Sequence, residues 1–310
     1  MGRVRVILNP YAGRGSAGKL REKLAAALAR AGVDFELVAT RGPGEATGLA
    51  AEARRAGVKT VVAAGGDGTV NEVLNGLAEA TPEDETIGKL AILPIGSGND
   101  LADMLGCPRD ITQAVARIAA GRTRCIDVGK TRLISPSRHV VRYFDNNMGL
   151  GFEAQVTLES YRIHWGASAL RYVMAALRSL RRYRVPQVEI RWETAGGQIE
   201  ERRQRALLVS VGNSPRTGGV FFLTPDARLD DGLFDLGVVR EVSRARILLL
   251  LPKTLRGAHR DEPVIELTRC RRLWFHCAEG VPVHLDGEVV MADVQTAEVE
   301  IQPGRLEIVV

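Results

Sequence analysis

The stretch Val61-Val62-Ala63-Ala64-Gly65-Gly66-Asp67-Gly68-Thr69-Val70-Asn71-Glu72 decides the fold, because an apolar run ends abruptly in three glycines placed around one aspartate. The run predicts a buried strand, and the residues after it predict a tight turn and a helix that continues through Asn75. Glycine permits positive φ and lets a backbone N–H approach an anion closely, and Thr69 is a candidate cap for the helix. The stretch predicts either a phosphate-binding loop or an ordinary tight turn.

A second loop of the same kind follows at Ala91-Ile92-Leu93-Pro94-Ile95-Gly96-Ser97-Gly98-Asn99-Asp100-Leu101-Ala102, where an apolar run again ends in glycines before a helical pattern. Because each apolar run is followed by a glycine loop and a helix, the two runs are predicted to be strands of one parallel sheet. Both loops are then expected at the carboxyl edge of the sheet, where open α/β sheets bind ligands. The second loop therefore favours a ligand site over a simple turn.

The two loops, with Asn71-Glu72 and Asn75-Gly76-Leu77 after the first, closely resemble the catalytic domain of the diacylglycerol kinase and sphingosine kinase family, especially its soluble bacterial lipid kinases. The resemblance covers nearly the whole chain in order. It continues through Asn9-Pro10-Tyr11-Ala12-Gly13, Ile126-Asp127-Val128-Gly129, Asn147-Met148-Gly149-Leu150-Gly151-Phe152, Gly212-Asn213, Asp230-Asp231-Gly232 and Asp286-Gly287-Glu288.

The resemblance implies a fold like that of NAD kinases and diacylglycerol kinases, and the residue pattern agrees with it. With 310 residues, the chain favours two domains. Strands and helices alternate up to Cys125–Val128, which predicts an α/β domain at residues 1–130 with a parallel sheet and flanking helices. Strand-like segments dominate afterwards, which predicts a β-rich, sandwich-like domain at residues 131–310. The boundary is expected in the polar stretch Gly129–Arg138, and in the family the last strand can return to the first domain.

Composition limits the partners. The net charge of +5, from 42 basic and 37 acidic residues, suits acidic ligands, an anionic membrane surface or simply a mildly basic surface. It is not the concentrated charge of a nucleic-acid binder. The four cysteines match no zinc spacing and predict reduced thiols in a cytoplasmic protein. The sequence leaves the oligomeric state open, a homodimer included.

Contact with a lipid would have to be peripheral, because the chain starts directly in a strand and has no apolar run near the ~20 residues that span a bilayer. Only two stretches of the second half are convincingly helical, Tyr161–Tyr183 and Val242–Leu255. The first carries Trp165 among several arginines, Arg182 included, so it could lie on anionic lipid. Its arginines could equally complement the dipole at a helix C-terminus.

The resemblance also implies a site for ATP and Mg²⁺ in a cleft between the domains. The residues that would line the nucleotide are Asn9, Thr40, Gly65, Gly66, Asp67, Gly68, Thr69, Val70, Asn71 and Ser97. Asp67 is expected to act in catalysis by holding magnesium directly or through water. Glu288 matches the family's general base, which would accept the proton of a lipid hydroxyl.

A second, structural magnesium is implied by the Asp230-Asp231-Gly232 segment. On this resemblance Asp231 supplies a side-chain oxygen, and Arg228 and Leu233 supply carbonyl oxygens, which are ligands that suit magnesium. A hairpin turn explains the same residues without a metal.

The leading functional interpretation is an ATP-dependent lipid kinase of lipid metabolism and phospholipid biosynthesis, acting on a hydroxyl of diacylglycerol or a related lipid. One alternative is an NAD kinase-like enzyme, because NAD kinases share the first loop. The second loop argues against it, since Gly96-Ser97-Gly98-Asn99-Asp100 resembles the lipid kinases. The other alternative is a nucleotide-binding regulator without catalysis, against which Asp67 and Glu288 both stand at the matching positions.

Overall fold

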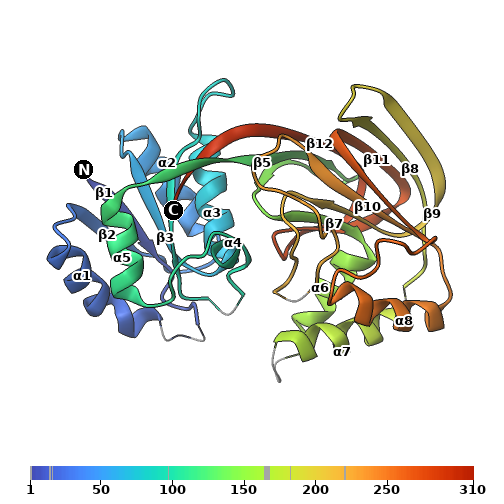
Figure 1. Cartoon of the computed structure of the whole chain (residues 1–310), viewed down its shortest axis with the longest axis horizontal. Helices are drawn as coiled ribbons and strands as arrows, with labels where there is room; N and C mark the ends of the chain where they lie inside the picture. Colours follow the sequence, from blue (N-terminus) through green and yellow to red (C-terminus); the bar gives the residue numbers. More distant parts are fainter. Residues whose placement is uncertain are drawn as a thin grey trace. The chain divides into compact units, whose positions relative to one another are not determined.

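The computed structural model describes residues 2–13, 15, 17–96, 98–163, 168–181, 183–219 and 221–310 (Figure 1). It divides into two compact units, which are described one at a time. Unit 1 comprises Met1–Val128 and Gly304–Val310, and unit 2 comprises Gly129–Pro303. The last strand, β12 (Glu288–Val309), contributes residues to both.

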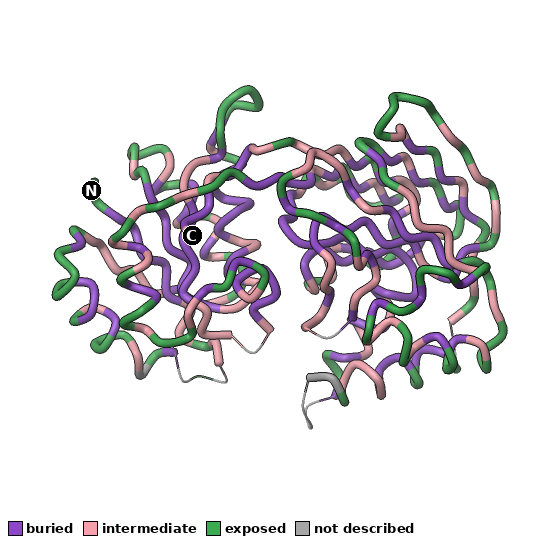
Figure 2. The backbone as a smooth tube through the Cα atoms, viewed as in Figure 1, coloured by how far each residue is buried: buried purple, intermediate pink, exposed green. Residues whose placement is uncertain are grey.

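Unit 1 is built on a parallel sheet in the order β12-β4-β3-β1-β2. Its own strands are β1 (Val4–Leu8), β2 (Phe35–Ala39), β3 (Thr60–Gly65) and β4 (Gly88–Pro94). The connecting segments are the 3-10 helix η1 (Ala17–Leu20) and the helices α1 (Arg21–Arg30), α2 (Glu45–Arg55), α3 (Asp67–Glu79), α4 (Asp100–Met104) and α5 (Ile111–Ala120). All residues of β1 and β3 are buried (Figure 2), as expected for a sheet covered on both faces.

Helices cover the two faces of this sheet in pairs. Leu24 and Leu28 of α1 and Val115 of α5 pack against alternate residues of β1, such as Val6. Helices α2 and α3 lie on the other face and approach each other closely at Gly76. A Cβ at Gly76 would lie only 2.0 Å from the carbonyl oxygen of Thr47 on α2. The glycine of the Asn75-Gly76-Leu77 motif is therefore needed for helix packing.

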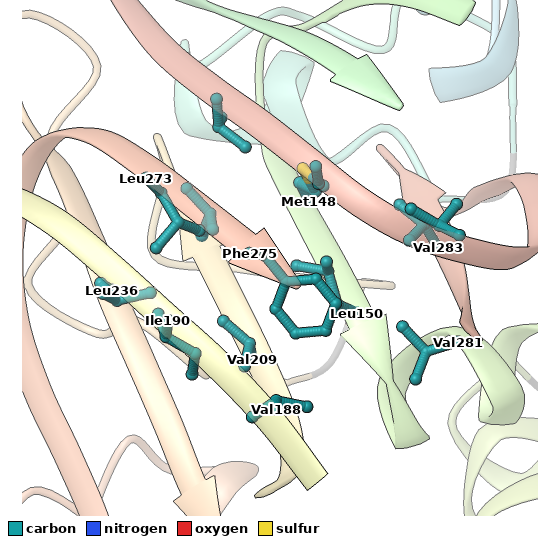
Figure 3. Packing of buried hydrophobic residues seen from close by; sticks show 14 of the residues in the cluster. Met148, Leu150, Val188, Ile190, Val209, Leu236, Leu273, Phe275, Val281 and Val283 are labelled. Atoms are coloured by element: carbon teal, nitrogen blue, oxygen red, sulfur yellow. The ribbon is translucent and has the colours of Figure 1, made fainter. Parts of the chain in front are cut away.

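Unit 2 is an antiparallel sheet that folds back around its own core. Its strands are the second part of β5 (Thr123–Ile134), β6 (His139–Phe144), β7 (Asn147–Gly151), β8 (Gln187–Thr194), β9 (Ile199–Gly212), β10 (Phe234–Arg240), β11 (Ile265–Leu285) and the first part of β12. The two long strands β9 and β11 each pair with β7, β8 and β10. Figure 3 shows side chains such as Met148, Ile190, Val209 and Phe275 packed together in the space that these strands enclose.

Three helices cover the opposite face of β9 and β10. They are α6 (Phe152–Ser160), α7 (Ser168–Leu180) and α8 (Arg244–Thr254). Val156 of α6, Ala176 of α7 and Ile247 of α8 pack in one cluster with Leu207 and Val239 of the sheet. None of the helices in the described part of the chain is long and apolar enough to cross a membrane.

The structure confirms the predicted fold class, an α/β domain followed by a β-rich domain. It differs from the sequence-based expectation in three places. Helix α6 was not predicted, and α7 is shorter than the predicted helix at Tyr161–Tyr183, in which Trp165 and Arg182 lie outside the described residues. Strand β5 continues without a break to Ile134, where a polar linker was expected. Thr69 does not cap α3, because that helix already begins at Asp67 and has Gly66 at its N-cap.

Candidate active site

The carboxyl ends of the strands of unit 1 bring together most of the residues predicted for the nucleotide. Asn9 follows β1, and its amide Nδ2 donates a hydrogen bond to Thr69 Oγ1 at 3.1 Å. Thr40 follows β2, is buried, and is held by a backbone bond from its N–H to Leu8 O at 2.9 Å. The first glycine loop follows β3, which pairs with β1. These residues therefore share one edge of the sheet.

The glycines of the two loops allow close contact between the loops. Gly65 O accepts hydrogen bonds from the backbone N–H groups of Ile95 at 2.8 Å and of Gly96 at 3.1 Å. A Cβ on Gly96 would lie 2.3 Å from the Cα of Gly66, and a Cβ on Gly98 would lie 2.5 Å from Asp67 Oδ2. Gly66 itself has a φ of −106°. Close approach, rather than the positive φ that the sequence suggested, is what requires glycine at these positions.

Asp67 ties the first loop to the second. Its carboxylate accepts backbone hydrogen bonds from Asn99 N at 2.8 Å and from Asp100 N at 2.7 Å, at the start of α4. A carboxylate bonded in this way is held in a fixed position. The predicted magnesium ligand is thus also the structural link between the loops.

Asn99 was not singled out from the sequence, yet it shapes the second loop. It is buried and has a φ of 61°, in the left-handed region that Asn tolerates better than most residues. Its side chain donates to Gly96 O at 2.7 Å and accepts from Gly96 N at 3.1 Å. Asn following a glycine-rich turn is the signal that could have identified it. The predicted nucleotide residue Ser97 in this loop lies outside the described residues.

The residues after the first loop stabilise its helix. Val70 is buried, and its N–H donates to Gly66 O at 3.1 Å. Asn71 accepts hydrogen bonds from Asn75 Nδ2 through its side-chain and backbone oxygens, at 3.1 and 2.9 Å. Glu72 accepts from the N–H groups of residues 44 and 46, at 2.8 and 3.0 Å, and so caps α2. Gly66 at the N-cap of α3 has no side chain that could cap the helix, and this N-terminus in the first loop fits an anion such as a phosphate.

In unit 2, Asp286 and Gly287 form the two-residue turn between β11 and β12. Their φ angles of 49° and 83° indicate a type I′ turn. The Asp286 carboxylate accepts backbone hydrogen bonds from residues 145, 146 and 147 at 3.2, 3.0 and 2.9 Å. These bonds fix the turn on which Glu288 follows.

Glu288 is exposed, and Tyr161 lies beside it. The Tyr161 hydroxyl is 3.0 Å from Gly287 O and 3.3 Å from Glu288 Oε2, and it accepts a hydrogen bond from Val289 N at 3.3 Å. Desolvation raises the pKa of Tyr161, and the negative charge of Glu288 raises it further. The phenol therefore stays protonated and can donate to the carboxylate.

A cavity of about 970 Å³, counting the part open to solvent, lies within unit 2 between the sheet and helices α6, α7 and α8. Its roof is apolar and includes Val156, Tyr172, Ile247 and Leu250. Gly287 is part of its wall, so the cavity reaches the turn that precedes Glu288. Apolar residues from several elements have no common spacing, which is why the sequence did not reveal this cavity.

At the segment predicted to bind a structural metal, Asp231 Oδ1 accepts a hydrogen bond from Leu233 N at 3.2 Å, and Oδ2 is paired with the guanidinium of Arg269. Arg269 also lies 3.7 Å from Asp235, and burial raises the pKa of that carboxyl to about 6. No group of three or more His, Cys, Asp or Glu among the described residues could hold a metal ion. The cation that contacts Asp231 here is Arg269, and the role of Arg228, Asp231 and Leu233 in magnesium binding stays a prediction.

Comparison with known proteins gives consistent matches along the chain. Residues 3–131 match the family model of the diacylglycerol kinase catalytic domain, and residues 146–310 match the model of the YegS C-terminal NAD kinase beta sandwich-like domain. The chain is 33% identical over 290 residues to a diacylglycerol kinase of Bacillus subtilis (strain 168), a match that covers 93% of this chain and 90% of the relative. It is 31% identical over 309 residues to a diacylglycerol kinase of Mycobacterium tuberculosis (strain ATCC 25618 / H37Rv), covering 99% and 95%.

A crystal structure described as a diacylglycerol kinase from Bacillus anthracis str. Sterne has the same fold. Its TM-score to this chain is 0.73 at 27% sequence identity, covering 99% of this chain and 96% of that one. Both domain models match in the order in which the two units occur, and the relatives align over nearly their full length. The chain therefore belongs to the diacylglycerol kinase family of lipid kinases.

Proposed function

We propose that this protein is an ATP-dependent kinase that phosphorylates a hydroxyl of diacylglycerol or a related lipid. The observation that carries the proposal is the apolar cavity of unit 2, whose wall includes Gly287, the residue immediately before Glu288. A lipid chain in this cavity would place its polar end at the turn that carries a carboxylate. An enzyme that phosphorylated a fully polar nucleotide would have no use for such a cavity.

The nucleotide would bind at the glycine loops of unit 1. Backbone N–H groups at the start of α3 would contact its phosphates, and Asn9, Thr40 and Asn71 lie at the same edge. Asp67 would hold Mg²⁺, either directly or through water. When bound, Mg²⁺ would neutralise charge on the transferring phosphoryl group.

Glu288 is the proposed general base. Its carboxylate would accept the proton of the lipid hydroxyl as the oxygen attacks phosphorus. The hydroxyl of Tyr161 would hold Glu288 in position from 3.3 Å. The proposed reaction requires the γ-phosphate of ATP to lie within reach of the lipid hydroxyl and in line with it.

Access from a membrane surface is part of the proposal, with the protein cytoplasmic and peripherally bound. Helices α7 and α8 form the roof of the cavity through Tyr172 and Leu250, and both also expose large apolar side chains to solvent. Leu249 of α8 is 63% exposed, and Leu170 of α7 is 47% exposed. With basic side chains on the same helices, such as Arg178 in the last turn of α7, these residues suit an anionic lipid surface.

The test is a screen of purified protein with labelled ATP and Mg²⁺ against diacylglycerol, phosphatidylglycerol, sphingosine, ceramide and NAD. We expect phosphorylation of diacylglycerol and none of NAD. Gly237→Leu should fill the cavity and abolish lipid turnover while leaving ATP affinity unchanged, because Gly237 lines the cavity. Gly196→Leu, outside the cavity lining, is the matched control. Phosphorylation of NAD alone would support the NAD kinase alternative, and ATP binding without any transfer would support the regulator.

A further inference from the structure

Gly237, Ser210 and His284 of the cavity lining belong to a row of paired residues on four neighbouring strands. Gly237 of β10 pairs with Ser210 of β9, Ser210 pairs with Gly149 of β7, and Gly149 pairs with His284 of β11. Directly paired residues of antiparallel strands share one face of the sheet. Their neighbours along the strands, such as Leu150 and Val209, point to the opposite face and into the core. On the face towards the helices, the row therefore has two glycines without side chains and the two polar side chains of Ser210 and His284.

Glu153 of α6 lies over this row and is 8% exposed. The absence of a side chain on Gly149 makes room for it, because a Cβ there would lie 2.6 Å from Glu153 Oε2 and 2.4 Å from His284 Nε2. One oxygen, Oε1, accepts a hydrogen bond from Asn147 Nδ2 at 3.0 Å and lies 3.1 Å from His284 Nε2. The other, Oε2, is buried and has no hydrogen-bond partner among the described residues.

His284 connects this carboxylate to the turn before Glu288. The ring is fully buried, and its Nδ1 lies 3.3 Å from the N–H of Gly287, which donates to it. Because Nδ1 accepts this bond, Nε2 carries a proton; it lies 3.1 Å from Glu153 Oε1 and makes no hydrogen bond among the described residues. Oε1 thus has a hydrogen bond from Asn147, whereas Oε2 has no partner among the described residues and can accept from a group that enters the cavity.

A carboxylate oxygen can only accept a hydrogen bond, so its ligand must carry a donor. The ester groups of a lipid offer none, and the reacting hydroxyl has a single proton, which goes to Glu288 in the proposed reaction. A buried polar atom without a partner is costly, and a ligand that satisfies it gains the corresponding free energy. The neighbouring Ser210 hydroxyl is also buried without a partner among the described residues, and it can donate to a carbonyl oxygen.

We propose that Glu153 and Ser210 form a subsite for the polar backbone of the lipid, in which Glu153 Oε2 binds a second hydrogen-bond donor of the substrate. Such a lipid carries a free hydroxyl or N–H group besides the hydroxyl that is phosphorylated. Monoacylglycerols and sphingoid bases have this chemistry, and diacylglycerol does not. The proposal rests on the proposed lipid kinase function and extends its substrates to lipids with two donors.

The experiment compares mono-octanoylglycerol, sphingosine and dioctanoylglycerol with wild-type protein and with Glu153→Gln. The variant keeps the side-chain volume and removes the charge. We expect the wild type to phosphorylate mono-octanoylglycerol as well as dioctanoylglycerol. Glu153→Gln should lower kcat/KM for the two-donor lipid by about tenfold or more relative to dioctanoylglycerol, the value of a hydrogen bond to a charged acceptor. Selective loss with sphingosine instead would identify N–H as the donor that is bound.

Two controls separate the subsite from general damage. Glu159→Gln makes the same change on the same helix, at a residue that pairs with Arg162 and does not line the cavity, and should leave all ratios unchanged. Ser210→Ala should weaken the mono- and diacyl lipids alike, because both carry an ester carbonyl. Equal losses for all lipids in Glu153→Gln, or phosphorylation of dioctanoylglycerol but of neither two-donor lipid by the wild type, would overturn the proposal.

Binding is measured separately by the rise in melting temperature that each lipid causes without ATP, since a ligand that binds only folded protein stabilises it. Mono-octanoylglycerol should stabilise the wild type more than it stabilises Glu153→Gln. If no lipid is phosphorylated but this difference is present, the kinase function is wrong and the subsite is right. If lipids are phosphorylated but the difference is absent, the subsite is wrong.

Discussion

Replacing Asp67 by asparagine should destabilise the protein as well as inactivate it. The two Asp67 oxygens accept backbone N–H groups at 2.8 and 2.7 Å and thereby join the two glycine loops. Asparagine keeps one acceptor oxygen and turns an NH₂ group towards the other N–H. One charge-assisted bond is then lost and the second becomes neutral, which costs about 2–3 kcal/mol together.

This loss corresponds to a fall in melting temperature of roughly 3 to 5 °C for a protein of this size. Amide hydrogen exchange locates the effect, because the N–H groups of Asn99 and Asp100 lose their acceptors and should exchange faster than in the wild type. Phosphoryl transfer should fall by about 10²-fold or more, as expected when charge stabilisation in the transition state is removed.

Asp84→Asn is the matched control, since Asp84 is exposed on the loop before β4 and should change neither stability nor exchange. Unchanged protection at residues 99 and 100, with a melting temperature within about 1 °C of wild type, would refute the structural role of Asp67. If that variant still lost phosphoryl transfer, the loss would be assigned only to the contact of the Asp67 carboxylate with the metal or the nucleotide.

Four further predictions test other parts of the molecule. Glu288→Gln should keep ATP affinity and lower turnover by about 10²-fold or more, with a flattened acidic limb of the pH profile; normal turnover would move the base elsewhere. If magnesium binds Asp231, Asp231→Asn should reduce the thermal stabilisation by magnesium without nucleotide; if Arg269 is the only cation there, wild type and variant should respond identically. The carboxyl of Asp235 has a pKa of about 6 in place of 3.8, so the folded state binds its proton more tightly than the unfolded state does. The contribution of Asp235 to stability should therefore be fully present below about pH 4 and be lost as the pH rises through about 6, a slope in urea titrations that Asp235→Asn should remove. Sedimentation with anionic vesicles should weaken as salt rises, and equal binding to neutral vesicles would contradict the electrostatic contribution.

The order of strands and helices in unit 1 could be predicted because its sheet is buried on both faces, and continuous apolar runs such as Val4–Leu8 mark such strands clearly. The location of the residues predicted for the nucleotide at one sheet edge followed from the same pattern. The physical reason for the glycines in the two loops could not be predicted from this pattern. Gly96 needs to be glycine because of Gly66, which lies in a different loop, and no local pattern records a contact of that kind.

Unit 2 was harder to predict from the sequence. Helix α6 begins at Phe152, directly after β7 ends at Gly151, so no polar turn separates the two periodic patterns. Its first turn carries Glu153, which appeared in the sequence as one more acidic residue. Its position over Gly149 depends on the pairing of β7 with β9 and β11, and these strands are far apart in the chain.

The last strand affects how unit 1 folds while the protein is being synthesised. Residues Leu306–Ile308 of β12 pair with β4, and Arg305 donates side-chain hydrogen bonds to the carbonyl oxygens of Pro82 and Glu85, at 3.0 and 3.2 Å. During synthesis, β4 therefore forms an unpaired edge of the sheet until the ribosome has completed all of unit 2. An unpaired edge can pair with a neighbouring chain, so nascent or truncated chains that stop before Gly304 should be aggregation-prone. Folding of the first unit is completed only by the final residues of the chain.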